Sequence, residues 1–212
     1  MIVAIESAST DLSIAVAQPD GTLIADAAWS SEQRQSAELL PRLLELLQQT
    51  GNHLDRASAI AVGLGPGSFT GLRVAMSLAK GLALSLGRPL VGVPSLQAWL
   101  ASEPDATAAV ARAGAAEAYV LRPGDAAPHI AERDRLPDIV GDRPLVPTEL
   151  ARAFGLSNAT PPRGGAAALA RLAAERLRLA PGGDDLRTIE PIYLRAPRGV
   201  QDAASEGRVT WL

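Results

Sequence analysis

The chain has 212 residues, of which 47% are hydrophobic and 20% charged, with a net charge of −3 and a pI of about 5.4. This composition predicts a globular protein of one large domain or two small lobes, without the basic excess that proteins binding nucleic acid unaided usually show. The absence of cysteine excludes disulfides, thiol catalysis and cysteine metal sites.

The N-terminal sequence MIVAIES reads as a strand, because its apolar run is too short for a signal peptide and no basic segment precedes it. No apolar run approaches the length of a membrane span. We therefore expect a soluble, cytoplasmic protein that has no membrane partner.

The first hundred residues predict alternating strands and helices. Strands at 2–5 and 12–17 are followed by a turn at Pro19-Asp20-Gly21, which should return the chain antiparallel over 22–29. The elements expected next are, in order, a leucine-rich helix at 36–49, a strand at 58–63, a glycine loop, a helix at 70–86, a strand at 89–93 and a short helix through Leu100. The order β-β-β-α-β-α-β-α is typical of an antiparallel meander extended by parallel α/β units, which gives a mixed sheet with helices on both faces.

The pattern weakens beyond Glu103. The expected features there are a strand pair at 107–112 and 117–121, a proline-rich stretch of little periodicity at 122–147, a loop at 160–165, an amphipathic helix at 166–179, a short extended piece at 189–194, and a frayed tail after Arg195. We therefore divide the chain into an N-terminal lobe at 1–100 and a smaller, degenerate second lobe at 101–212. The helix at 166–179 is a candidate to pack back on the first lobe.

The segment AVGLGPGSFTGLR is the most informative stretch of the chain. It runs from a strand into four glycines, which are Gly63, Gly65, Gly67 and Gly71. We expect Pro66 and Gly67 to form the centre of a type II turn, with a positive φ at Gly67, and Ser68 or Thr70 to cap the following helix. Such a loop can seat an anion at the helix N-terminus, or it can let two backbones approach closely. It matches neither the dinucleotide-binding nor the Walker A pattern.

The helix at 70–86 is apolar around most of its circumference. Its polar stripe is narrow and contains only Arg73, Ser77 and Lys80. Such a helix is buried on more than one side, so either it is central to its own domain or its outer face meets a partner. Arg73 can pair with an anion or with a carboxylate of the second lobe, or it can lay its stem on the surface with a solvated head.

The turn after the first strand offers a second candidate site. A carboxylate closing a strand, followed by hydroxyl groups, can surround a phosphate, and the residues of this vestigial phosphate loop are Glu6, Ser7, Ser9 and Thr10. The spacing alone favours the alternative, a polar hairpin in which side chains hydrogen-bond to the backbone.

Catalytic and metal-binding side chains are not evident. His53 and His129 are far apart in loop-like contexts, so we interpret both as surface residues and expect no metal site. Ser68 lacks the Gly-x-Ser-x-Gly context of a nucleophile and has no histidine placed to serve it, so we interpret it as a helix cap.

Three segments resemble the bacterial TsaB family, namely MIVAIESASTDLSIAV, AVGLGPGSFTGLRVAMSLAKGLAL and EPIYLR at 190–195. The resemblance covers the first hundred residues and the short C-terminal segment. It implies an α/β fold of the actin/hexokinase-like (RNase H-like) type, with a mixed sheet and two lobes, of which the second is shortened.

The resemblance also implies a function. TsaB-like proteins are inactive partners of the catalytic subunit TsaD, which acts with the ATPase TsaE to transfer a threonylcarbamoyl group to the adenosine after the anticodon of tRNA. It implies no cofactor on this chain, since ATP and metal would be held by the partner, and only indirect contact with tRNA. The surface for a TsaD-like subunit or for a homodimer would come from the helices at 36–49 and 70–86, through Leu39, Leu43, Leu72, Arg73, Ala75, Met76, Ala79 and Ala83.

Departures from the family's catalytic members favour a scaffold. Their metal-binding H-x-x-x-H corresponds here to residues 34–39, which contain no histidine. The D-A-R-x-G-E-V-Y segment of better-conserved family members appears at 110–119 without its aspartate and with one residue more. Two alternatives stay open, both enzymes: an ATPase or small-molecule kinase that uses the turn at 6–11 as a phosphate loop, and, with less support, a metalloprotease.

Overall fold

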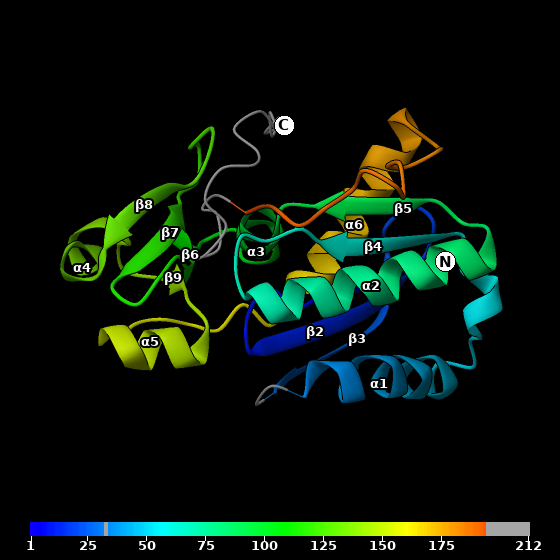
Figure 1. Cartoon of the computed structure of the whole chain (residues 1–212), viewed down its shortest axis with the longest axis horizontal. Helices are drawn as coiled ribbons and strands as arrows, with labels where there is room; N and C mark the ends of the chain where they lie inside the picture. Colours follow the sequence, from blue (N-terminus) through cyan, green and yellow to red (C-terminus); the bar gives the residue numbers. More distant parts are fainter. Residues whose placement is uncertain (32–33, 194–212) are drawn as a thin grey trace.

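The computed structural model describes residues 1–31 and 34–193 and contains two β-sheets (Figure 1). The first sheet has the strand order β3-β2-β1-β4-β5, and its strands are β1 (Ile2–Glu6), β2 (Asp11–Ala17), β3 (Leu23–Ser30), β4 (Ala59–Gly63) and β5 (Leu90–Val93). β1, β2 and β3 are antiparallel, whereas β4 and β5 run parallel to β1. This topology confirms the predicted mixed sheet of the actin/hexokinase-like (RNase H-like) type.

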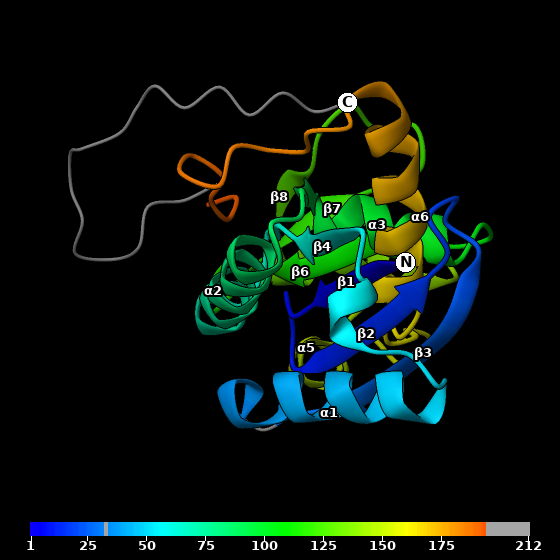
Figure 2. The same cartoon turned by 90° about the vertical axis from the view of Figure 1, so that its right-hand side faces the viewer.

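Helices cover both faces of the first sheet (Figure 2). α1 (Gln35–Gln49) and α2 (Phe69–Leu86) pack on one face, where Val3 and Ile5 of β1 join their core. The alternate residues Ile2 and Ala4 point to the other face, where α6 (Gly165–Leu179) lies next to α3 (Ser95–Ser102). The period-2 alternation of side chains along a strand therefore separates two cores.

The core under α6 is built mainly from alanine. Its members are Ile2, Ala4, Ala15, Ala17, Ala59, Ala61, Val91, Val93, Ala98, Ala166, Ala168, Leu169, Ala170, Ala173 and Ala174. Small side chains on both surfaces allow the helix backbone to approach the sheet closely. A helix that follows the second sheet in the sequence thus completes the core of the first sheet.

The second sheet has the order β8-β7-β6-β9, with β6 (Ala108–Arg112), β7 (Glu117–Leu121), β8 (His129–Glu132) and β9 (Pro144–Leu145). The antiparallel pairing of β6 with β7 confirms the predicted strand pair. The stretch of little periodicity at 122–147 holds not only β8 and β9 but also η2 (Arg133–Arg135) and α4 (Leu136–Ile139), and α5 (Thr148–Phe154) follows it. These elements are too short to show a period, and only tertiary packing around Leu136 and Phe154 stabilises them.

The boundaries of α2 follow from its flanking residues. The Ser68 hydroxyl accepts a hydrogen bond from the Gly71 N–H at 3.2 Å, which confirms the predicted helix cap, and Gly87 ends the helix in the left-handed region at φ 61°. With 18 residues and a mean hydropathy of 1.2, α2 is long and apolar enough to cross a membrane by length and composition, contrary to the sequence-based expectation. Seven of its residues are buried, five of them in the core shared with the sheet and α1, Leu72 in a cluster with Trp99, and Gly71 against Ser7, which accounts for this composition.

The predicted extended piece at 189–194 forms no strand over its described part, 189–193. The chain instead runs beside β5, where the Asp184 N–H donates to the Leu90 carbonyl at 2.8 Å, and then crosses to Leu64, whose carbonyl accepts from the Ile192 N–H at 2.7 Å. Leu194 and the tail after Arg195 lie outside the described residues.

Candidate functional site around the glycine loop and helix α2

The glycine loop packs directly on the turn that follows β1. The Ser68 N–H donates to the Ala8 carbonyl at 2.6 Å. A Cβ atom at Gly67 would overlap that same carbonyl oxygen, and a Cβ at Gly71 would overlap the carbonyl oxygen of Ser7. Of the two interpretations that the sequence allowed, the geometry therefore shows close approach of two backbones.

The predicted conformation of this loop is wrong at one position. The positive φ belongs to Gly65, at 88°, and not to Gly67. Gly67 is needed for a different reason, because its missing side chain leaves room for Ala8. The requirement for glycine at position 67 therefore comes from a contact between segments about sixty residues apart in the sequence, and local turn patterns do not reveal such a contact.

Glu6 is turned into the protein rather than toward the surface. Its Oε1 accepts hydrogen bonds from the Ala8 N–H at 2.7 Å and from the Ser95 hydroxyl at 3.1 Å, while its buried Oε2 has no partner among the described residues. Gly63 leaves the space that this carboxyl group fills. Burial raises the pKa of Glu6 to about 7, because desolvation penalises the charged form more than the hydrogen bonds favour it.

A cavity of about 370 Å³ lies between the turn after β1, the start of α2 and the second sheet. Ser9 and Thr10 line it, whereas Glu6 and Ser7 are buried and do not. The Ser9 hydroxyl is already bonded to the backbone of Asp11, donating to its carbonyl at 3.0 Å and accepting from its N–H at 3.1 Å. The turn is therefore the polar hairpin that the spacing favoured.

The far wall of this cavity is charged. Arg112 at the end of β6 lies 3.3 Å from Glu149 on α5, and both line the cavity opposite Ser68 and Thr70. Gly67 and Ser68 of the glycine loop are thus brought together with Ser9 and Thr10 of the predicted phosphate loop. The other predicted residues do not line this cavity, namely Gly65, Gly71, Glu6 and Ser7.

Asp11 links the two sheets, a role that the sequence analysis missed. Its carboxylate accepts hydrogen bonds from the Thr148 N–H at 2.6 Å, from the Thr148 hydroxyl at 3.0 Å and from the Ser30 hydroxyl at 2.6 Å. Because Thr148 is the first residue of α5, Asp11 at the start of β2 caps a helix of the second lobe.

Replacing Asp11 with alanine should loosen this connection. We expect the free energy of unfolding to fall by about 1–3 kcal/mol, because three buried or partly buried donors lose their acceptor. Limited proteolysis of the folded protein should then cut near α5 sooner than in the wild type. The variant Asp134→Ala, which changes a carboxylate on η2 with no described ion pair, is the control, and equal proteolysis of both variants would contradict the assigned role.

The outward face of α2 consists of small, polar and exposed apolar residues. Its exposed members are Phe69, Thr70, Arg73, Ser77, Gly81, Leu84 and Ser85, with Lys80 partly buried beside them. The Leu84 side chain is 76% exposed, and a Cβ atom at Gly81 would meet nothing within 4 Å. In the described part of the chain, Ser77, Gly81 and Leu84 therefore stay exposed on the central turns of this face.

Most of the predicted interface residues do not lie on this face, so that assignment is wrong. The seven that are buried in the chain's own core are Leu39, Leu43, Leu72, Ala75, Met76, Ala79 and Ala83. α1 and α2 must cover the hydrophobic face of the first sheet, and the sides of the helices with the strongest apolar pattern do so. Of the predicted set, only Arg73 is exposed.

Arg73 takes part in a cluster with two aromatic rings at the start of α2. Its guanidinium lies 3.9 Å from the centroid of the Phe69 ring, and its Nε donates to the Tyr193 hydroxyl at 3.3 Å. The Phe69 and Tyr193 rings are 5.3 Å apart. Arg73 therefore binds neither a carboxylate of the second lobe nor any other acid among the described residues, but packs its stem on the surface with an exposed head.

A larger cavity, of about 770 Å³, lies away from the glycine loop, between β5, α6 and the chain at 184–192. Arg176 and Asp184 form an ion pair of 2.8 Å at its wall. Asp184 also accepts from the Gly92 N–H at 2.7 Å, and Arg176 donates to the Gly92 carbonyl. These contacts provide hydrogen-bond partners for the backbone N–H and carbonyl groups of Gly92 at the outer edge of β5. We therefore interpret the surroundings of this cavity as structural.

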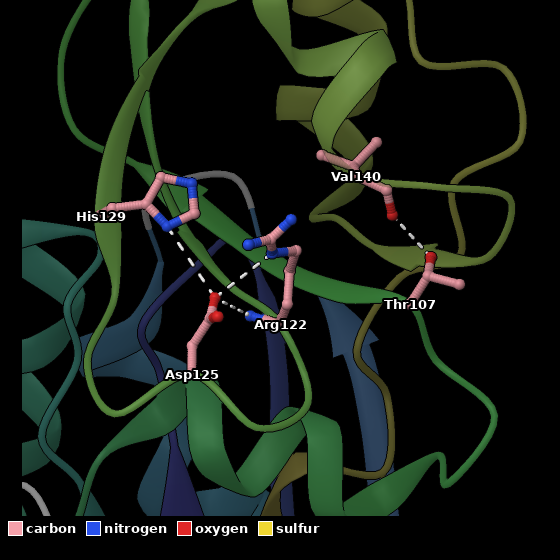
Figure 3. A network of polar contacts seen from close by, with 5 residues as sticks. All are labelled: Thr107, Arg122, Asp125, His129 and Val140. Carbon is pink, nitrogen blue, oxygen red and sulfur yellow. Dashed lines mark hydrogen bonds and ion pairs between the residues drawn. The ribbon is translucent and has the colours of Figure 1, made fainter.

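Both histidines lie on the surface, as predicted. His129 of β8 lies 3.9 Å from Asp125, whose carboxylate accepts from the backbone N–H of Arg122 at 3.0 Å and from its Nε at 3.4 Å (Figure 3). The hydrogen bond from the Arg122 backbone, followed by its side chain, lowers the pKa of Asp125. In the described ranges, no group of three or more His, Asp or Glu residues is placed to hold a metal ion.

Comparisons with known proteins agree with this geometry. The family model "TsaD: tRNA N6-adenosine threonylcarbamoyltransferase" matches residues 29–151. The tRNA threonylcarbamoyladenosine biosynthesis protein TsaB of Escherichia coli (strain K12) is 37% identical over 95 residues, which are 45% of this chain and 40% of that protein. A tRNA N6-adenosine threonylcarbamoyltransferase of Fervidobacterium nodosum is 35% identical over 108 residues, 44% of this chain and 32% of that protein. The match thus spans less than half the length of these relatives.

A solved structure described as YeaZ from Pseudomonas aeruginosa superposes with a TM-score of 0.65 at 24% identity, over 91% of this chain and 99% of that chain. This likeness shows that the two share a fold. The family model covers more than half of the chain, and it spans the glycine loop, α2 and the second sheet. The chain therefore belongs to the TsaD family, that of the tRNA N6-adenosine threonylcarbamoyltransferases, and is a TsaB-like member of it.

Proposed function

We propose that this protein is a non-catalytic, cytoplasmic subunit in the synthesis of threonylcarbamoyladenosine on tRNA. It docks on a TsaD-like catalytic subunit, which holds the ATP and the metal, and a TsaE-like ATPase completes the machinery. tRNA is reached indirectly, through the complex. The names of the relatives and the family membership support the pathway, and the outward face of α2 supports the docking role.

The observation that carries the docking role is the pair Gly81 and Leu84 on α2. Glycine inside a helix costs about 1 kcal/mol relative to alanine, and nothing in this fold requires it at position 81. A large exposed leucine follows within one turn. Together they offer a groove into which the backbone of a second helix can pack and an apolar side chain to cover.

The contacts that the residues of the predicted phosphate loop make in the structure support a non-catalytic role. The Glu6 carboxyl group is turned into the core, and Ser9 is bonded to its own backbone. In the sequence, residues 34–39 lack the histidine pair of the catalytic relatives. These side chains therefore hold the fold together instead of facing a substrate.

The first experiment mixes this protein with the TsaD-like protein of the same organism and measures the mass of the complex by size-exclusion chromatography with light scattering. We expect a mixed complex that Gly81→Trp and Leu84→Glu weaken by at least about tenfold, or about 1.4 kcal/mol. Leu179→Glu is the matched control, because Leu179 is 90% exposed on α6, across the sheet from α2. A wild-type chain that ignores the TsaD-like protein would contradict the proposal.

The cavity beside Thr10 and Ser68 favours one alternative function, that of a nucleotide-binding ATPase or kinase. It lies at the N-terminus of a long helix, where free N–H groups attract phosphate. Isothermal titration calorimetry of the isolated chain with ATP distinguishes the two functions. Tight binding would favour the enzyme, whereas the subunit proposal expects none.

A further inference from the structure

Helix α2 lies within the longest stretch of the chain that contains no acidic residue. Residues 56–102 contain neither Asp nor Glu, although the chain contains 23 acidic residues in all. The basic residues in this stretch are Arg56, Arg73, Lys80 and Arg88, and Lys80 is the only lysine of the protein. The chain is acidic overall, so α2 differs in charge from the rest of the molecule.

Two of these basic residues, Arg73 and Lys80, lie on the outward side of α2. Arg73 and Lys80 are seven residues apart, which is about two helical turns and places them on one stripe. Arg88 follows just beyond the end of the helix and is exposed. Within residues 1–31 and 34–193, none of the three forms an ion pair, and the hydrogen bond of Arg73 goes to the neutral Tyr193.

The neighbouring helix does not neutralise this charge. On α1, Glu38 lies 3.9 Å from Arg34 and accepts from the Trp29 indole at 2.9 Å, so its charge is paired within its own region. Glu45 accepts a hydrogen bond from the neutral Gln49, one turn further along α1, and within residues 1–31 and 34–193 it forms no ion pair with a basic residue of α2. The face of α2 therefore presents positive charge next to the exposed Leu84.

This charge pattern opposes contact of α2 with itself. A two-fold dimer places the same patch of both copies together. With Ser77 at the two-fold axis, Arg73 of one antiparallel helix would approach Lys80 of the other, and a register shifted by about two turns would bring Arg73 toward Arg88. Both arrangements bring like charges together without an acid on either helix.

This inference rests on the proposed docking function. The geometry points to a partner that presents an acidic helix to α2, with carboxylates placed for Arg73 and Lys80 next to an apolar contact with Leu84. Opposite charges speed association and reject wrong partners, so the same face disfavours a second copy of this chain. The exposed Leu84 favours a protein surface over the phosphate backbone of RNA, which offers it no apolar contact.

The unique lysine makes this testable with a zero-length carbodiimide cross-linker, which joins an amine to a carboxylate only when the two are in contact. In the complex with the TsaD-like protein, we expect a cross-link from Lys80 to an Asp or Glu of the partner, identified by peptide mass spectrometry. Lys80→Arg should keep the complex and lose the cross-link. Lys80→Glu should weaken the complex about tenfold and strengthen the homodimer, because its carboxylate would face Arg73 of the second copy. Arg178→Glu makes the same change of charge at an exposed position of α6, and it should neither weaken the mixed complex nor strengthen the homodimer.

Ionic strength gives a second readout. Raising salt from about 0.05 M to about 0.5 M shortens the screening length severalfold, so the mixed complex should weaken while any homodimer strengthens. A mixed complex that forms without the Lys80 cross-link and tolerates Lys80→Glu would overturn this inference and leave the docking function intact. If no mixed complex forms at all, both the acidic-partner inference and the proposed docking function are overturned. Loss of tRNA binding by Lys80→Glu, with the protein complex unchanged, would assign the face to RNA and overturn the acidic-partner inference.

Discussion

Alanine in place of Gly71 is expected to lower the free energy of unfolding by about 3 kcal/mol, whereas alanine in place of Gly81 should raise it by about 0.5–1 kcal/mol. Both glycines lie inside α2, so the change in helix propensity is the same. The difference is steric. A methyl group at Gly71 would overlap the Ser7 carbonyl oxygen, and the backbone of the turn after β1 would have to move, while a methyl group at Gly81 meets open space.

Urea denaturation followed by circular dichroism measures both changes, and the midpoint shifts in opposite directions if the glycine loop is a close-packing device. Should the Gly71→Ala variant fail to fold, its soluble yield beside that of Gly81→Ala gives the same contrast. Equal effects at the two positions would contradict the steric account. An intact Gly71→Ala variant would return the loop to its other interpretation, an anion seat.

Glutamine in place of Glu6 is expected to remove a strong dependence of stability on pH. The folded state raises the pKa of Glu6 from 4.5 to about 7, so the folded protein binds this proton more tightly than the unfolded chain does. The stability that this contributes is fully present below pH 4.5 and is lost as the pH rises through 7. A shift of this size corresponds to about 3 kcal/mol. Carboxylates with a lowered pKa, such as Asp125, act in the opposite direction in acid.

The measurement is therefore a difference between variants. The free energy of unfolding of the wild type minus that of Glu6→Gln should fall by up to about 3 kcal/mol between pH 5 and pH 8. Glutamine preserves the size of the side chain and the acceptor for the Ala8 N–H, so the difference isolates the charge. Glu45→Gln on the exposed side of α1 should show no such trend. A flat difference for Glu6→Gln would mean that its carboxyl group is solvated.

Hydrophobic periodicity determined the skeleton of this protein. The buried runs at 2–5 and 12–17, the Pro19-Asp20-Gly21 turn and the apolar helical faces predicted the elements of the first sheet and its antiparallel meander β1-β2-β3. Each of these rests on contacts within one element or between neighbours in the sequence. The helix cap at Ser68 was predictable for the same reason, since donor and acceptor are three residues apart. The glycine loop was recognisable from composition alone.

Predictions from the sequence were wrong or left open where the environment of a side chain depends on distant segments. Glu6 was a candidate for a vestigial phosphate loop, but its carboxyl group lies inside the protein, where it accepts from Ser95 and fills the space left by Gly63. The sequence analysis assigned Ala75 and Ala79 to a partner, but the first sheet needs that side of α2 for its own core. The other elements that cover the sheet determine which face of an apolar helix stays exposed.

What the sequence by itself determined is the set of elements, their order in the first lobe and the family resemblance. These follow from local periodicity and from one dense motif, AVGLGPGSFTGLR. Only the tertiary structure decided that Gly67 and Gly71 serve close packing, that Asp11 ties α5 to β2, and that Gly81 and Leu84 stay exposed on the outward face of α2. The physical reason is that burial is a property of the assembled layers, whereas periodicity shows only that a face will be buried, not against what.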